Sequence, residues 1–198
     1  FPEPVIEVIH ALGSAEEPAW LVGECVHEAL SERRSQVFQA RSCFTPRQIL
    51  AALSNAVPTA PGNARIMVPT PAGPVDILSA GQQEDLDSEL RRRTFSVHAM
   101  AFDPRATHLY DPHGGLSDTQ ALRLRGVADP ARRFARRPLE ALRGAGLLAR
   151  FGYEMHANLV PGFRAATPGL ARIRRAELRR ILVSLLGLPL PGRAIAAL

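Results

Sequence analysis

A change in the pattern of apolar residues near residue 125 constrains the fold of this chain most strongly. Before it, short apolar segments typical of strands alternate with segments typical of helices. After about Asp129 the pattern is helical, with one helix opened by Pro138 and an Arg-rich amphipathic helix at 171–186. The sequence therefore predicts an α+β (mixed α/β) protein. A small mixed sheet flanked by helices is expected in residues 1–125, and an all-helical segment in residues 126–198.

The individual elements follow from periodicity and turn residues. Strands are expected at 20–22, 35–41, 65–68 and 75–78, with a hairpin turn at 71–74. Helices are expected at 4–12 and 25–31, and at 46–53 with Thr45 as N-cap. Loops are expected at Pro58, Pro61 and Gly62 and, as a mobile acidic segment, at 81–90. Gly144 and Gly146 indicate close packing, because each costs a helix about 1 kcal/mol relative to alanine.

The charge is distributed unevenly along the chain. All 24 basic residues are Arg, and the formal net charge is +5. Residues 1–120 contain 9 Arg and 15 acidic residues, a net charge of −6, whereas residues 121–198 contain 15 Arg and 4 acidic residues, a net charge of +11. This asymmetry predicts an anionic partner for the second part, nucleic acid before a membrane. Solvated faces of Arg-rich helices are the alternative explanation.

Length and composition bound the class of protein. A chain of 198 residues is long enough to bury a sizeable core. The longest apolar run, 181–190, contains polar and helix-breaking residues and is too short to span a bilayer, so we expect no membrane association. Cys25 and Cys43 form neither a disulfide framework nor a metal-ligand spacing. Both are expected to pack as small buried residues in a cytoplasmic protein.

Five sequence blocks resemble, in order, the motifs of one enzyme family. Ala19–Glu28 is similar to LVGGxVRD, Arg92–Met100 to RRDFTINAM, and Asp111–Asp118 to DPFGGLEDL. Asp129–Arg143 is similar to DPxxRFxEDPLRxLR, and Arg172–Leu182 to ERIRxELxxLL. The chain is identified on these motifs as a member of the class II tRNA nucleotidyltransferases (CCA-adding enzymes) and bacterial poly(A) polymerases. The resemblance implies a polymerase beta-like nucleotidyltransferase head and a helical neck, truncated before the family's body and tail.

The metal-binding motif of that family is missing. The resemblance implies transfer of a nucleotide from ATP or CTP to an RNA 3′ end, with two Mg²⁺ ions held by carboxylates. A D-x-D pair on a strand puts two carboxylates on one face, but Val37 and Gln39 stand at these positions, and residues 33–48 contain no Asp or Glu. Asp76 matches the third acidic position and is the retained catalytic candidate; an ordinary exposed strand residue is the alternative. One carboxylate cannot hold two divalent ions well, so no metal ligands are assigned.

The nucleotide-binding positions are also altered. The resemblance assigns this role to Gly23, Arg92, Arg93, Arg137, Glu140, Arg143 and Arg150. The second glycine of the phosphate-binding turn is Glu24, whose carboxylate would repel a triphosphate by about 4 kcal/mol per charge pair at 4 Å and a dielectric near 20. The family's base-reading Asp and Arg are exchanged for Arg137 and Glu140, which at i and i+3 are expected to pair with each other. The alternative is that they offer a donor and an acceptor to a base in reversed order.

The substitutions fall on positions that carry chemistry. In the second block Thr94 and His98 replace the family's Asp and Asn, and His27 is expected at the surface or partly packed rather than as a catalytic base. The positions expected to define the fold match the family: Gly23, Phe95, Asp111, Pro112, Gly114, Gly115, Asp118, Phe134, Pro138 and Leu139. Loss confined to the chemical positions predicts a fold that is kept for another purpose.

Three hypotheses about function follow. The first is a catalytically inactive relative that acts as an RNA-binding or scaffold module, with a tRNA-like RNA bound through the basic neck. The second is an active CCA-adding or poly(A)-adding enzyme with a rearranged metal site, which would use Mg²⁺ and ATP or CTP and would need carboxylates such as Glu28 and Asp76. The third is a scaffold for a protein partner or a homo-oligomer, without RNA. Salt-sensitive RNA binding separates the first from the third.

Overall fold

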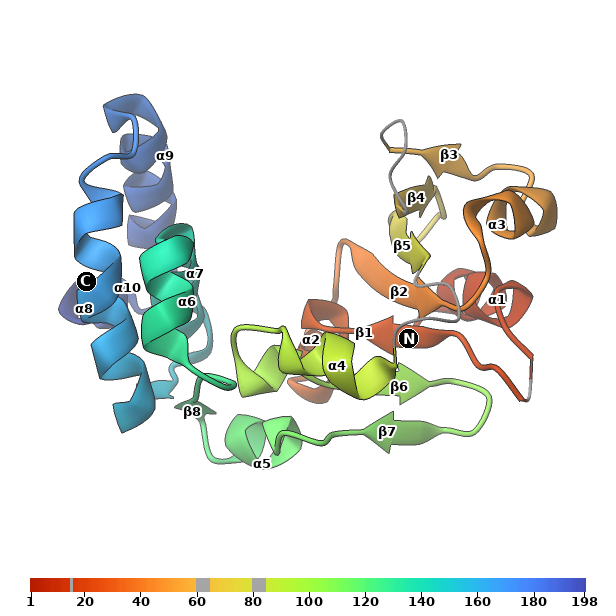
Figure 1. Ribbon diagram of the computed structural model, residues 1–198, viewed down its shortest axis with the longest axis horizontal. Coiled ribbons are helices and arrows are strands. Elements are labelled where there is room, and N and C mark those ends of the chain that lie inside the picture. The colour runs from red at the N-terminus through yellow and green to blue at the C-terminus, as the bar shows by residue number, and fades with distance from the viewer. Residues whose placement is uncertain (15, 60–64, 80–84) are drawn as a thin grey trace. The chain divides into compact units, whose positions relative to one another are not determined.

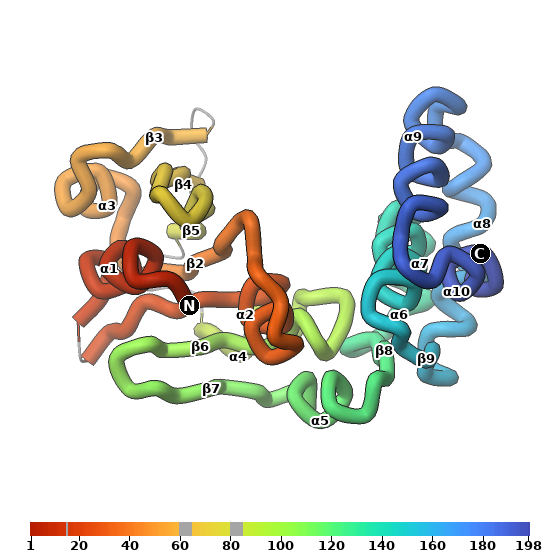
Figure 2. The backbone as a smooth tube through the Cα atoms, turned by 180° about the vertical axis from the view of Figure 1, so that it is seen from behind, coloured from red at the N-terminus to blue at the C-terminus, as the bar shows by residue number. Residues whose placement is uncertain are grey.

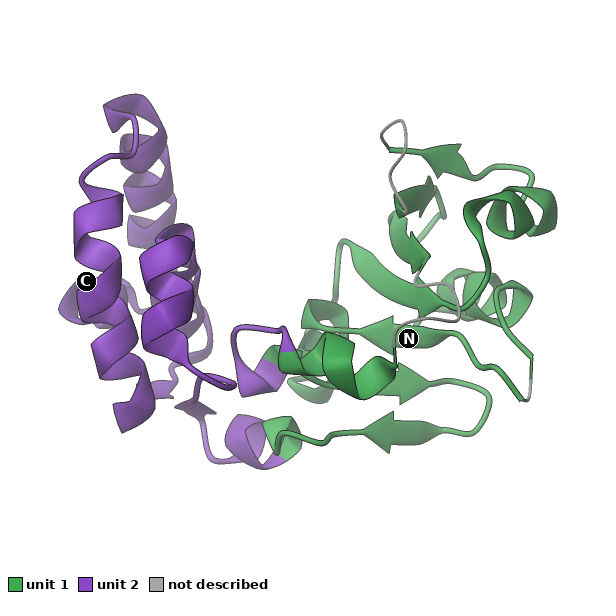
Figure 3. Cartoon of the chain, viewed as in Figure 1, with its two compact units in different colours: residues 1–91, 98–116 green, residues 92–97, 117–198 purple. Residues whose placement is uncertain are grey.

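The chain forms two compact units that are interleaved in sequence. The structure is a computed structural model that describes residues 1–14, 16–59, 65–79 and 85–198 (Figure 1). Unit 1 comprises residues 1–91 and 98–116, and unit 2 comprises residues 92–97 and 117–198 (Figure 3). The mixed α/β class and the helical C-terminal part are confirmed. The division into head and neck at residue 125 stays a prediction.

Unit 1 is built on a mixed sheet. The strands in its described residues are β1 (Trp20–Val22), β2 (Phe38–Ser42), β3 (Val57–Pro58), β4 (Arg65–Val68), β5 (Val75–Ser79), β6 (Ala101–Asp103) and β7 (His108–Tyr110). They are ordered β3-β4-β5-β2-β1-β6-β7. Only β2 and β5 run parallel among these pairs; the other neighbours are antiparallel. The predicted strands at 20–22, 65–68 and 75–78 are confirmed, and the first carries the buried core residues Leu21 and Val22.

Helices cover both faces of this sheet. Their bounds are α1 (Glu3–Ala11), α2 (Glu24–Leu30), α3 (Pro46–Ala52) and α4 (Leu86–Arg91). Figures 1 and 2 show α1 and α2 on one face and α4 on the other. The predicted start of α3 is confirmed: the Thr45 hydroxyl accepts a hydrogen bond from the Gln48 N–H, and the Gln48 side chain accepts one from the Thr45 N–H at 2.8 Å. This reciprocal cap fixes the N-terminus of the helix.

Two predictions for unit 1 were wrong. The predicted loop at 81–90 contains α4 in its described part, because Asp85 caps the helix by accepting the Ser88 N–H at 2.6 Å and because Leu90 is fully buried. Pro58, expected in a loop, belongs to the two-residue edge strand β3, where a missing N–H is tolerated. The strand predicted at 35–41 is confirmed as β2, which begins three residues later and ends one residue later than predicted. Pro61, Gly62 and residues 80–84 lie outside the described residues.

Unit 2 is mainly helical. Its helices are α6 (Pro130–Arg136), α7 (Leu139–Phe151), α8 (Val160–Leu170), α9 (Arg175–Leu186) and α10 (Pro191–Ala197), and the chain enters it through α5 (Gly115–Gln120). Two short strands, β8 (Arg123–Leu124) and β9 (Glu154–Met155), pair in parallel. The helix predicted at 171–186 begins only at Arg175, and α8 was not predicted. Helix α8 contains Pro168 and two glycines, which lower its intrinsic helix propensity, so the local sequence does not predict it. Within the described residues no helix is long and apolar enough to cross a membrane.

Gly144, where the sequence predicts close packing, lies against a cluster of aromatic rings. The rings of Phe95 and Phe134 lie 6.1 Å apart, and those of Phe134 and Phe163 lie 5.6 Å apart, both edge to face. A Cβ atom at Gly144 would lie 2.9 Å from Cζ of Phe95 and 3.2 Å from Cζ of Phe163, so the prediction is confirmed there. At Gly146 the nearest atom would lie 3.4 Å away, an ordinary contact, and close packing is not found.

Asp118, one of the residues expected to define the fold, lies in a buried ion cluster. Its carboxylate is fully buried and accepts hydrogen bonds from the Ser96 hydroxyl at 2.6 Å and from Nε of Arg123 and Arg125 at 2.7 Å each. Burial by itself would raise the pKa of Asp118. The hydrogen bonds from Ser96, Arg125 and Arg123 outweigh burial and hold the pKa below its usual value. The cluster thereby joins the segment at residue 96 to the strand at 123–124.

Candidate functional site

Two positions at which the sequence resemblance places metal ligands lie side by side in the sheet. β2 and β5 are parallel, and Gln39 is the register partner of Asp76. Register partners on neighbouring strands share a face and lie about 4.8 Å apart. Val37 comes directly before β2 and is 51% exposed. The backbone arrangement that would bring carboxylates at positions 39 and 76 together is therefore present.

The side chains at these positions do not fit two Mg²⁺ ions. The Asp76 carboxylate is ion-paired with the guanidinium of Arg65 from β4. Gln39 offers one neutral oxygen and Val37 offers none, whereas Mg²⁺ prefers carboxylate and water oxygens. In the parts of the chain that the structure describes, no group of three or more His, Cys, Asp or Glu side chains is placed to hold a metal ion. Asp76 is thus a half-buried, ion-paired strand residue rather than an exposed one.

The turn before α2 has a backbone conformation that favours glycine. Gly23 has φ +79° and ψ −131°, a conformation that favours glycine, and its N–H donates to the Met100 carbonyl at 3.1 Å. Glu24 is the first residue of α2 and is exposed. The expectation that His27 lies at the surface or is partly packed was wrong: it is fully buried, with its ring 5.3 Å from that of His98. Residues 25–28 are all buried because the short helix packs on more than one side.

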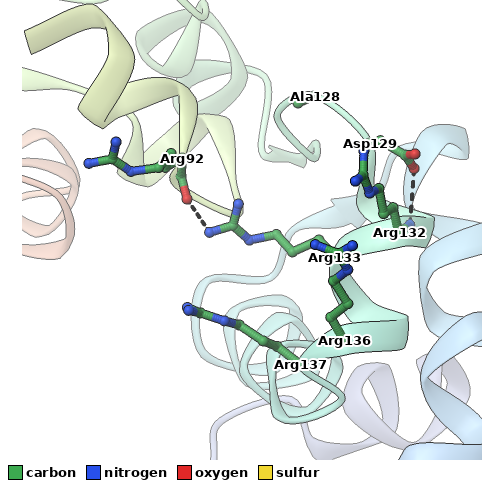
Figure 4. Close-up of a pocket in the computed structure, with 7 residues that line it drawn as sticks. All are labelled: Arg92, Ala128, Asp129, Arg132, Arg133, Arg136 and Arg137. Atoms are coloured by element: carbon green, nitrogen blue, oxygen red, sulfur yellow. Dashed lines mark hydrogen bonds between the residues drawn. The ribbon is translucent and has the colours of Figure 1, made fainter. Parts of the chain in front are cut away.

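Two of the predicted nucleotide-binding residues, Arg92 and Arg137, line one open pocket in unit 2. Its volume is about 500 Å³. The other residues that line it are Ala128, Asp129, Arg132, Arg133 and Arg136 (Figure 4). Asp129 caps α6 by accepting the Arg132 N–H at 3.1 Å. We call this the Arg pocket, because five of its seven lining residues are Arg.

Arg133 is the most buried of the cations in the Arg pocket. Its guanidinium donates a hydrogen bond to the Arg92 carbonyl oxygen, and Figure 4 shows it extended toward that residue. Burial lowers the pKa of Arg133; the charges of Arg137 and Arg93 act in the same direction, while Glu140 opposes them. The pocket therefore holds several positive charges close enough to repel one another.

Glu140 does not pair with Arg137 as expected. Its carboxylate accepts a hydrogen bond from the Thr94 hydroxyl at 3.0 Å and pairs with Arg143 at 3.0 Å. The prediction failed because Arg137 follows the last residue of α6 in a non-helical conformation (φ −135°, ψ +74°) and α7 begins only after Pro138. The two residues are therefore not on one continuous helix, and the i, i+3 geometry is lost.

The predicted site residues thus fall into separate groups. Arg92 and Arg137 share the Arg pocket, and Glu140 is paired with Arg143, whose side chain is 72% exposed. Arg150 lies two turns further along α7, over the ring of Phe151 at 5.3 Å. Gly23 and Asp76 belong to unit 1, and half-buried Arg93 precedes Thr94 in unit 2.

Three of the five arginines of the Arg pocket have no site role predicted from the sequence. Arg132, Arg133 and Arg136 lie in the motif at 129–143 but match none of the positions expected to bind a nucleotide. The signal that would have found them is their spacing, since residues i and i+4 of a helix share a face. Asp129-Pro130 marks the start of that helix in the sequence.

Comparisons with curated proteins find tRNA nucleotidyltransferases. The chain is 26% identical over 179 residues to the CC-adding tRNA nucleotidyltransferase of Shouchella clausii, covering 90% of this chain and 46% of that protein. It is 28% identical over 178 residues to the CC-adding tRNA nucleotidyltransferase of Geobacter sulfurreducens, covering 86% and 41%. A Multifunctional CCA protein of Xylella fastidiosa is 37% identical over 100 residues, which is 50% of this chain and 21% of that protein. The chain spans less than half the length of these relatives, and no protein-family model matches it.

Solved structures of CCA-adding enzymes share the fold of this chain. The Bacillus stearothermophilus CCA-adding enzyme in complex with CTP matches 98% of this chain and 51% of its own with a TM-score of 0.86 and 20% identity. The Thermotoga maritima CCA-adding enzyme complexed with tRNA matches 99% and 50% with a TM-score of 0.82 and 20% identity. At these identities the likeness establishes the fold.

Proposed function

We propose that the chain is a catalytically inactive member of the class II family of CCA-adding tRNA nucleotidyltransferases and that it binds RNA. The observation that carries the proposal is the pair of adjacent strands β2 and β5. They bring Gln39 beside Asp76, and the single carboxylate there is already paired with Arg65. A site of this composition cannot neutralise the charge that develops on a transferred phosphate, because metal ions do that work in nucleotidyl transfer.

RNA binding is supported by charge. Residues 121–198 carry a net charge of +11, and the Arg pocket lies in this part of the chain together with Arg92. Arg guanidinium groups bind phosphate oxygens bidentately and remain charged at all physiological pH values. A basic surface of this kind gives affinity for nucleic acid through phosphate contacts.

The test is nucleotide binding and transfer by the purified chain. ATP and CTP would be titrated by calorimetry with and without Mg²⁺, and incorporation into a tRNA lacking its 3′ end would be measured beside the Shouchella clausii relative as positive control. We expect no Mg²⁺-dependent binding and no incorporation, but RNA binding that weakens steeply with salt. Micromolar Mg²⁺-dependent binding or clear incorporation would establish the active enzyme instead.

The other outcomes identify the remaining alternatives. An active site rebuilt from Glu28 and Asp76 would require Glu28, which is buried and accepts a hydrogen bond from the Ser35 hydroxyl at 2.6 Å, to change its environment. Asp76→Ala would abolish activity in that case. A folded chain that binds neither nucleotide nor RNA would be a scaffold for protein partners.

A further inference from the structure

We propose that the Arg pocket binds phosphate groups of RNA, at the place where the family's pattern reads a nucleobase; this rests on the proposed RNA-binding function. The family motif EDPLR aligns with Arg136, Arg137, Pro138, Leu139 and Glu140. Two carboxylates of the pattern are therefore two guanidinium groups here. A carboxylate can accept hydrogen bonds from the amino group of a base, whereas a guanidinium is only a donor. The exchange favours an anionic ligand over a base edge.

The one acidic group of the exchanged motif is not available to replace the lost acceptors. The Glu140 carboxylate is engaged by the Thr94 hydroxyl on one oxygen and by Arg143 on the other. Glu140 is also 8% exposed, so its charge faces these two partners rather than solvent. The acceptor half of a base-reading pair is therefore occupied within the protein.

Three cations of the Arg pocket, in contrast, are exposed to a ligand. Arg132, Arg136 and Arg137 are exposed, and within the described residues no ion pair joins any of them to a carboxylate. The carboxylate that lines the pocket, Asp129, accepts the N–H that caps α6. Like charges gathered around an open pocket repel one another, and a bound anion removes that repulsion. The pocket therefore favours an anion with several negative charges.

The arrangement suits consecutive phosphates better than one isolated phosphate. Arg132, Arg133 and Arg136 span four helical steps, about 6 Å along the axis of α6, and Arg137 follows directly after the end of that helix. Arg92 extends the row of cations from a different segment of unit 2 (Figure 4). A polyanionic backbone can contact the whole row, whereas one isolated phosphate can contact only part of it. RNA backbone is therefore the favoured source of the phosphates.

The test compares two variants with equal changes in charge. Arg136→Gln/Arg137→Gln removes two cations from the Arg pocket, and Arg179→Gln/Arg180→Gln removes two exposed cations from α9 of the same unit. Binding of fluorescein-labelled 12-mers of oligo(U), oligo(A) and oligo(C) would be followed by anisotropy over a series of KCl concentrations. Circular dichroism and urea unfolding would show that both variants remain folded.

We expect the pocket variant to lower affinity by about tenfold or more on all three oligonucleotides and to reduce the slope of log K against log[salt] by about 1.4, or about 0.7 per lost phosphate contact. The α9 variant should change both quantities much less. If the two variants behave alike while the parent binds RNA, the pocket assignment is overturned and the proposed function stands. A loss that depends on the base would show base reading and would also overturn it.

A competition arm separates the sources of phosphate. Tripolyphosphate, ATP and CTP would each be titrated against the bound 12-mer. Equal competition by all three supports phosphate recognition, and competition by ATP or CTP but not tripolyphosphate refutes it. If the parent does not bind RNA, the proposed function fails and so does RNA as the ligand; direct tripolyphosphate binding that is lost in the pocket variant would then assign the pocket to a small phosphorylated molecule.

Discussion

Restoring the missing carboxylates should make the stability of unit 1 depend on Mg²⁺. In a Val37→Asp/Gln39→Asp variant, the new carboxylate at position 39 would face Asp76 from the neighbouring parallel strand. Two unit charges about 4.8 Å apart repel by about 3.5 kcal/mol at an effective dielectric of 20. Arg65 is paired with Asp76, and both side chains are partly solvated, so screening reduces this value. We expect the free energy of unfolding to fall by about 1–2 kcal/mol in EDTA.

Mg²⁺ should reverse the loss in the variant alone. An ion that binds only the folded state, present at 100 times its Kd, adds about 2.7 kcal/mol, and 1 kcal/mol shifts the Tm of a chain of 198 residues by about 2–4 °C. A rise of about 5–10 °C in Tm is therefore expected when MgCl₂ replaces EDTA, measured by circular dichroism. The parent should show no such rise, because its donor set does not fit the ion.

A matched control separates charge from packing. Val37→Asn/Gln39→Asn introduces side chains of nearly the same size without charge, and its Tm should be equal in EDTA and in MgCl₂. If the Asp variant likewise melts at one temperature in both conditions, positions 39 and 76 do not form a metal-binding edge. The backbone would then not hold these positions as a metal site requires, and the loss of the site would not be confined to the side chains.

Three further predictions concern packing, reactivity and pH. Gly144→Ala should destabilise the chain by about 1–3 kcal/mol in urea unfolding, because its Cβ would lie 2.9 Å from a phenylalanine ring, whereas Gly146→Ala should be neutral or stabilising by up to about 1 kcal/mol. Burial raises the pKa of Cys25 to about 11, so iodoacetamide at pH 8 should modify Cys43 but not Cys25 in the native chain. Both thiols should be modified in denaturant, and mass spectrometry would identify the labelled residues. Equal labelling of both thiols in the native chain would contradict this. The pKa of Asp118 is lower in the folded state than in the unfolded state, so its contribution to stability is present above about pH 4 and is lost as pH falls through the folded-state pKa. Asp118→Asn should lower the free energy of unfolding by about 3 kcal/mol at pH 7 and weaken its dependence on acid; an unchanged acid profile would contradict this.

Local signals predicted the elements whose ends are fixed by neighbouring residues. The strand at 20–22 ends at Gly23, and α3 is started by Thr45 and Pro46. The helix α4 was missed because long-range burial holds it in place: Leu90 is fully buried, and Glu89 pairs with Arg41 from β2 at 3.0 Å. No pattern within a short window contains those contacts.

At Pro138, in the candidate site, a short sequence window likewise does not predict which residues meet. Sequence spacing put Arg137 and Glu140 on one helix face, but the break between α6 and α7 separates them. Arg137 turns to the Arg pocket, and Glu140 binds Thr94, which is distant in sequence. The partner of a charged side chain depends on where the backbone turns, and a turn of one residue changes which groups meet.

The sequence by itself determined the family motifs, the absence of carboxylates at Val37 and Gln39, and the basic character of residues 121–198. These are properties of residue identity and order, and folding does not alter them. Only the tertiary structure decided that Gln39 lies beside Asp76, that Arg65 neutralises that carboxylate, and which Arg side chains gather around one pocket. Strand register and helix packing set these contacts, because they bring together residues that are far apart along the chain.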